Sequence, residues 1–94
     1  KKTEFGYVLN FLGAEIVIEK TAKSSAYVVY VKSMEEKIPD WAKKESSSYL
    51  LLESAKNEAE LLARDLWLEK QGWKFKAGYY ACLHGWFERS KGGN

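Results

Sequence analysis

Cys82 and His84 are the pair of side chains whose types and spacing could support nucleophilic chemistry. A thiol becomes a nucleophile when a base lies within hydrogen-bond reach, and residues two apart on a strand share a face. A cysteine is more commonly a small buried hydrophobic residue, however, and a lone histidine is more commonly structural. We therefore expect neither residue to be catalytic, and we expect the protein not to be an enzyme.

Other patterns for catalysis or cofactor binding are missing from the sequence. The phosphate-binding glycine loops G-x-G-x-x-G and G-x-x-x-x-G-K do not occur. One cysteine and one histidine are too few for the common zinc-ligand sets, and no calcium-loop spacing is present. The sequence therefore predicts no metal site and no cofactor.

The C-terminal quarter is basic and aromatic, which favours a nucleic-acid interface as the second choice. Residues 70–94 carry five basic residues against one acidic residue, whereas residues 53–69 carry five acidic residues against two basic ones. Basic side chains can neutralise phosphates, and aromatic rings between them can stack on bases. Such an interface would use Lys74, Lys76, Tyr80, Trp86 and Arg89, and we expect the rings of Tyr80 and Trp86 to be exposed. In the simpler alternative, Trp73 and Phe75 face the core while the lysines of the same strand face water.

Aromatic and leucine residues favour protein binding as the first choice. Four tryptophans and six tyrosines exceed what the core of a 94-residue chain needs, and both types are favoured at interfaces. Leu61 and Leu68 are seven residues apart on the polar side of a predicted helix, where they either cover a loop or contact another chain. We expect a small non-enzymatic protein-binding module of the adaptor or inhibitor type, whose partner is another protein or a second copy. Its predicted contact residues are Leu61, Leu68, Tyr30 and Trp41.

The first third of the chain has the pattern of β-strands. Alternating and β-branched residues predict antiparallel strands over residues 5–12, 15–20 and 26–32, with Gly13 in the first turn. The third strand is apolar on both sides, because Val29 and Val31 alternate with Val28 and Tyr30. One face must therefore pack on a helix, and the other is a candidate binding or dimer surface.

The middle of the chain predicts the main helix. Asn57 followed by Glu60 has the spacing of a capping box, so we expect a helix over Glu58–Gln71 that ends before Gly72. Its apolar stripe comprises Ala59, Leu62, Ala63 and Leu66. Pro39 predicts a short helical turn, and Tyr49–Leu52 has the composition of a further strand.

The C-terminal part predicts a second β region. Trp73–Ala77 alternates cleanly and is expected to be a strand. Residues 79–89 fit both strand and helix spacing, and their aromatic content makes strand the preferred choice, with Gly78 and Gly85 at bends.

Length and composition bound the architecture. We expect residues 1–94 to form a single α+β domain, a mostly antiparallel sheet of about five strands with one main helix packed on one face and a short helical turn near Pro39. The net charge of +2 is too small to make the whole molecule a polycation. Apolar runs are too short for a membrane segment, and the single thiol favours a cytoplasmic location.

Overall fold

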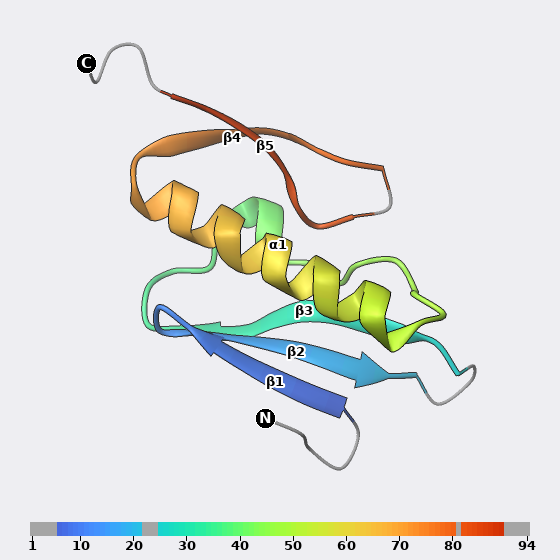
Figure 1. Ribbon diagram of the computed structural model, residues 1–94. Helices are drawn as coiled ribbons and strands as arrows, with labels where there is room; N and C mark the ends of the chain where they lie inside the picture. The colour runs from blue at the N-terminus through green and yellow to red at the C-terminus, as the bar shows by residue number, and fades with distance from the viewer. Residues whose placement is uncertain (1–5, 22–24, 81, 90–94) are drawn as a thin grey trace.

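The computed structural model describes residues 6–21, 25–80 and 82–89, which form an α+β fold (Figure 1). Its elements in chain order are β1 (Gly6–Phe11), β2 (Ala14–Lys20), β3 (Tyr27–Met34), the 3₁₀ turn η1 (Asp40–Ala42), α1 (Leu52–Lys70), β4 (Trp73–Gly78) and β5 (Gly85–Arg89). All strand pairs are antiparallel. The predicted fold class and the turn after Pro39 are confirmed. The strands divide into two sheets, β1-β2-β3 and β4-β5, with α1 between them.

The β1–β2 hairpin closes with a two-residue turn at Leu12 and Gly13. Both residues have positive φ angles, 50° and 78°, which is the geometry that matches the twist of the flanking strands. Glycine adopts this conformation without steric cost, whereas leucine does not. The predicted turn at Gly13 is therefore confirmed.

The three-stranded sheet packs on α1 through one face only. Its inward residues include Ile16, Ile18, Val29 and Val31, which join the apolar stripe of α1 in the core. Val17 pairs with Tyr30 on the opposite face, which points away from the helix. The predicted division of β3 into a core face and a second apolar face is confirmed.

Helix α1 begins well before the predicted cap. Its first residue is Leu52, and Asn57 is an exposed residue inside the helix, so the predicted cap at Asn57 is wrong. The N-cap residue, Leu51, makes no side-chain cap hydrogen bond. Ala55 is completely buried against the core, so tertiary packing extends the helix toward its N-terminus. The predicted end of the helix before Gly72 is confirmed.

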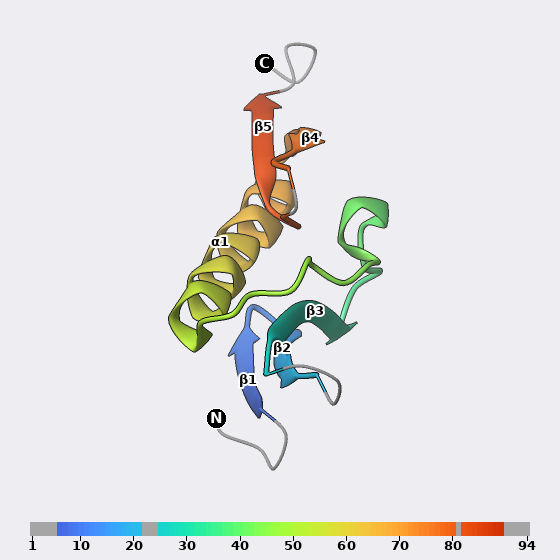
Figure 2. The ribbon, with the colours of Figure 1, turned by 90° about the vertical axis from the view of Figure 1, so that its right-hand side faces the viewer.

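The segment before α1 explains why the strands do not form one sheet. The backbone N–H of Ser46 donates to the carbonyl of Val29, and the Ser46 hydroxyl accepts the N–H of Val29, both at 2.9 Å. Tyr49 forms an isolated bridge with Tyr27, so the strand predicted over Tyr49–Leu52 is wrong. This segment occupies the edge of β3, and the β4–β5 hairpin lies on the other side of α1 (Figure 2).

Across the ranges 6–21, 25–80 and 82–89, no helix combines the length and the apolar character needed to cross a membrane.

Candidate functional site

Two buried carboxylates of α1 hold the segment that leads into β5. Glu58 is 2% exposed and Asp65 is 0% exposed, and their spacing of two helical turns places them on the same side of α1. Oε2 of Glu58 accepts the backbone N–H groups of Leu83 at 2.8 Å and His84 at 3.0 Å. Oδ2 of Asp65 accepts the N–H of Gly85 at 2.8 Å. The helix therefore fixes three consecutive backbone groups at the start of β5.

The remaining oxygens of these carboxylates also have partners. Nε and Nη2 of Arg64 donate to Oδ1 of Asp65 at 3.0 and 2.9 Å. Nδ1 of His84 lies 2.6 Å from Oε1 of Glu58. Among the described residues, no buried side-chain nitrogen or oxygen lacks a hydrogen-bond partner. Both carboxylates are thus satisfied, which is what their burial requires.

Tyr49, Glu58, Cys82 and His84 form a polar cluster where α1 meets this segment. One potential ligand atom each of Glu58, Cys82 and His84 lies within 4.8 Å of the others. The hydroxyl of Tyr49 donates to Sγ of Cys82 at 3.7 Å. Burial, followed by the hydrogen bond to Cys82 and the charge of Glu58, raises the pKa of Tyr49, so its hydroxyl stays protonated and remains a donor.

The sequence predicted that Cys82 and His84 could be neighbours, but it did not identify Glu58 as a member of this cluster. Glu58 is 26 residues from His84 in the sequence. It stands among other charged residues of the helix, so it was expected to face solvent. The available signal was the seven-residue spacing of Glu58 and Asp65, which puts two acids on one side of the helix, next to its apolar stripe.

Trp41 lies in an aromatic cluster with Phe75 and Phe87. The Trp41 and Phe75 rings stack with centroids 4.8 Å apart, and Phe87 meets both rings edge-on at 5.5 and 5.4 Å. Nε1 of Trp41 donates to Oε1 of Glu69 at 2.6 Å. This predicted contact residue is therefore half-buried and joins η1 to both the β4–β5 hairpin and α1.

The other predicted protein-contact residues lie on two separate surfaces. Leu61 and Leu68 are half-buried on α1, each three residues after one of the buried carboxylates. Tyr30 lies on the sheet face that points away from α1, where its hydroxyl donates to Oε1 of Glu19 at 3.4 Å. Partial burial and the neighbouring Glu19 raise the pKa of Tyr30. The structure thus does not bring Tyr30 together with the two leucines.

An exposed group of aromatic side chains lies at the end of the β4–β5 hairpin, and we call it the hairpin aromatic surface. It comprises Tyr79, Tyr80 and Trp86. Tyr80 is 97% exposed, Tyr79 is 49% exposed and Trp86 is 45% exposed. The Tyr79 and Trp86 rings are 5.6 Å apart. The predicted exposure of Tyr80 and Trp86 is confirmed.

The predicted nucleic-acid residues are only partly brought together. Lys74 pairs across the hairpin with Glu88, and Trp86 lies two residues before Glu88 on the same face. Nζ of Lys76 lies 3.6 Å from a carboxylate oxygen of Glu88, so one of the two lysines is already paired. Arg89 is paired with Trp73 on the opposite face, where its guanidinium carbon lies 5.7 Å from the Trp73 ring centroid.

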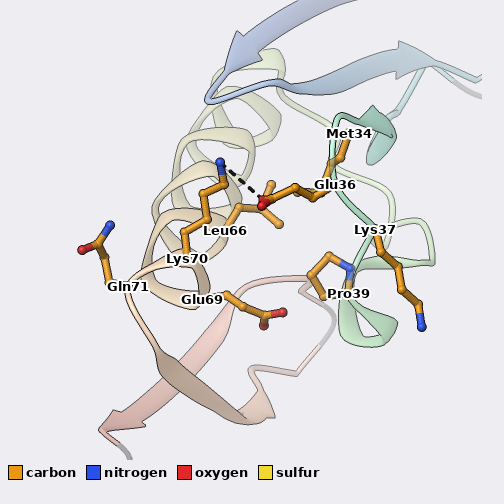
Figure 3. A pocket seen from close by; sticks show the side chains of 8 residues that line it. All are labelled: Met34, Glu36, Lys37, Pro39, Leu66, Glu69, Lys70 and Gln71. Atoms are coloured by element: carbon orange, nitrogen blue, oxygen red, sulfur yellow. Dashed lines mark ion pairs between the residues drawn. The ribbon is translucent and has the colours of Figure 1, made fainter. Parts of the chain in front are cut away.

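A polar pocket of about 560 Å³ lies between the end of α1 and the loop after β3 (Figure 3). Met34 and Leu66 contribute apolar groups, and Lys70 forms a 3.4 Å ion pair with Glu36 on its wall. Its other lining residues are Lys37, Pro39, Glu69 and Gln71. Two acidic and two basic side chains balance one another, so the pocket has no net charge with which to select an ion.

Comparison with known proteins does not add a functional assignment. No protein family model, no curated protein and no solved structure matches this chain. The geometry of the polar cluster and of the hairpin aromatic surface is therefore the basis for the functional argument.

Proposed function

We propose that this protein is a small non-enzymatic protein-binding module of the adaptor or inhibitor type, and that the hairpin aromatic surface is its contact site. The observation that carries this proposal is the exposure of three aromatic side chains at the end of the β4–β5 hairpin, Tyr79, Tyr80 and Trp86, where the rings of Tyr79 and Trp86 lie 5.6 Å apart. Tyrosine and tryptophan are the side chains most enriched among the residues that dominate binding energy at interfaces. A contact made there would bury a large apolar area with few rotatable bonds.

The attachment of the hairpin to α1 supports this role. Glu58 and Asp65 fix the backbone of residues 83–85, directly before Trp86. A contact residue on a fixed backbone loses little conformational freedom on binding, which favours affinity. The oxygens of the two carboxylates have partners in Arg64, His84 and the backbone before β5, so both side chains serve to hold the hairpin in place.

The cellular setting that goes with this function is the cytoplasm. Cys82 is a free, half-buried thiol, and thiols persist in a reducing compartment. The partner is another protein or, as the alternative, a second copy of the chain.

Paired affinity purification from the native host, read by quantitative mass spectrometry, tests the proposal. The bait variants are wild type and Tyr80→Ala/Trp86→Ala, with Trp67→Ala as the matched control because Trp67 is 43% exposed on α1. We expect a protein that wild type and Trp67→Ala recover equally and that the double variant loses. Equal recovery with all three baits would contradict the proposed site. A Leu61→Ser/Leu68→Ser bait tests the leucines of α1 separately.

Single-stranded nucleic acid is the second candidate ligand, because Lys74 and Trp86 share one face of the hairpin. Glu88 lies on that face too and pairs with Lys76, which weakens the attraction for phosphates. We therefore expect only millimolar to high-micromolar binding of short RNA and DNA strands. Submicromolar binding at physiological salt that is lost in Lys74→Glu/Lys76→Glu would make nucleic acid the first choice.

A further inference from the structure

The polar cluster brings together three different metal-ligating groups from parts of the chain that are distant in sequence. Glu58 comes from the first half of α1, whereas Cys82 and His84 belong to the segment before β5. Their ligand atoms lie within 4.8 Å of one another at a junction that is largely shielded from solvent. Thiolate, imidazole and carboxylate are the three side-chain ligands that zinc uses in proteins.

We propose that Cys82, His84 and Glu58 bind one zinc-type divalent ion. Sγ of Cys82, Nδ1 of His84 and Oε1 of Glu58 are the ligand atoms, and a water molecule completes the tetrahedral coordination that zinc prefers. The ion replaces the direct contact between Nδ1 of His84 and Oε1 of Glu58, which lie 2.6 Å apart. Zinc ligands at about 2.0–2.3 Å from the ion are farther apart than this, so the two side chains separate slightly on binding.

The surroundings already orient the ligands for this role. Oε2 of Glu58 is held by the backbone N–H groups of Leu83 and His84, so its other oxygen has a fixed direction. The Tyr49 hydroxyl donates to Sγ of Cys82, a contact that remains possible when the sulfur is a thiolate. Such partners of metal ligands fix ligand geometry and tune affinity.

The presence of a sulfur ligand selects the ion. Soft or borderline ions such as Zn²⁺ and Co²⁺ accept thiolate and imidazole, whereas Mg²⁺ and Ca²⁺ require oxygen ligands. An ion bound here would tie residues 82–84 to α1 more firmly, because it bonds to both. We therefore expect zinc to raise the unfolding temperature of the protein.

Titration of the reduced, metal-free chain with Co²⁺ tests the site directly. We expect a thiolate-to-cobalt charge-transfer band that saturates at one ion per chain, is reversed by Zn²⁺ and is unaffected by excess Mg²⁺. Cys82→Ser is the principal variant, because Cys82 is only half-buried and serine retains a hydrogen-bonding atom. It should abolish the band and remove the zinc-dependent rise in unfolding temperature.

Matched variants separate ligation from simple anchoring of the hairpin. Glu58→Gln should lower the Co²⁺ affinity at least about tenfold. Asp65→Asn, which alters the neighbouring anchor of the same segment, should keep the affinity of wild type if the chain remains folded by circular dichroism. Absence of a charge-transfer band in wild type, or Co²⁺ affinity in Cys82→Ser equal to that of wild type, would overturn the proposal.

Discussion

Asp65, which is completely buried in α1, accepts the backbone N–H of Gly85 at 2.8 Å at the residue where β5 begins. Gly85 also lies so close to β4 that a Cβ at this position would collide with the carbonyl oxygen of Ala77. Together with Glu58, which binds the two preceding N–H groups, this contact attaches the hairpin to the helix. This attachment fixes the position of the hairpin aromatic surface relative to α1.

Removal of the Asp65 carboxylate should therefore destabilise the fold. Asp65→Ala leaves the N–H of Gly85 buried without an acceptor and removes the partner of Arg64, so the free energy of unfolding should fall by about 2–3 kcal/mol. Urea denaturation followed by circular dichroism measures the change. Glu60→Ala is the matched control, because Glu60 is exposed on α1 and should change stability by less than about 0.5 kcal/mol. Equal effects of the two substitutions would show that Asp65 is not an anchor.

Substitution of Trp41 should reveal its internal role. Trp41→Phe keeps the stacking on Phe75 but removes the hydrogen bond to Glu69, at a cost of about 1 kcal/mol. Trp41→Ala should cost about 3 kcal/mol, because the whole aromatic cluster loses its centre. Trp86→Ala, at an exposed ring, should cost no more than about 1 kcal/mol. If Trp41→Ala and Trp86→Ala have the same free energy of unfolding, Trp41 is a surface residue and belongs to an interface instead.

Replacing Leu12 in the β1–β2 turn should increase the stability of the protein. Leu12 has a φ of 50°, which costs an ordinary side chain about 1 kcal/mol, and asparagine tolerates this conformation. Leu12→Asn should therefore raise the free energy of unfolding by about 1 kcal/mol in chemical denaturation. Leu50→Asn serves as the control, because Leu50 is more exposed and its backbone is not in this conformation. A destabilised Leu12→Asn protein would mean that the leucine packs on the hairpin.

Because Asn57 lies inside α1, replacing it with alanine should raise the stability of the protein, whereas a capping role would have predicted a loss of stability. As a helix cap, its replacement by alanine would cost about 0.5–2 kcal/mol. Inside α1, at an exposed position, alanine is the better helix former, so Asn57→Ala should stabilise the protein by about 0.5 kcal/mol. Thermal and urea unfolding of this single variant distinguish a helix that begins at Leu52 from one that begins after Asn57. A clear loss of stability would place the start of the helix near Asn57.

Local patterns were sufficient to predict most of the elements. The alternation before Gly13 predicted β1, the β-branched residues after it predicted β2, and Pro39 predicted the turn at η1, because in each case neighbouring residues determine the conformation. The start of α1 was missed because it depends on the burial of Ala55, which is a tertiary contact. The division into two sheets was missed for the same reason, since it depends on Ser46 occupying the edge of β3.

The residues of the site were harder to predict from the sequence than the elements of the fold. Tyr80 and Trp86 were predicted as exposed residues from strand alternation and composition, and they are exposed. Glu58 and Asp65 resemble the solvated acids around them, and only the backbone N–H groups that they accept in the folded chain explain their burial. Buried charged residues are rare enough that an acid in a helix is first interpreted as exposed.

The most direct measurement of the central claim is a calorimetric titration of the recovered partner into wild type, Tyr80→Ala/Trp86→Ala and Trp67→Ala. Performed at about 50 and 200 mM salt, it also separates an aromatic contact from a phosphate contact. The proposed function predicts that wild-type affinity changes little with salt, that the double variant binds at least about 30-fold more weakly, and that Trp67→Ala binds like wild type. A partner that binds the double variant as tightly as wild type would contradict the hairpin aromatic surface as the contact site.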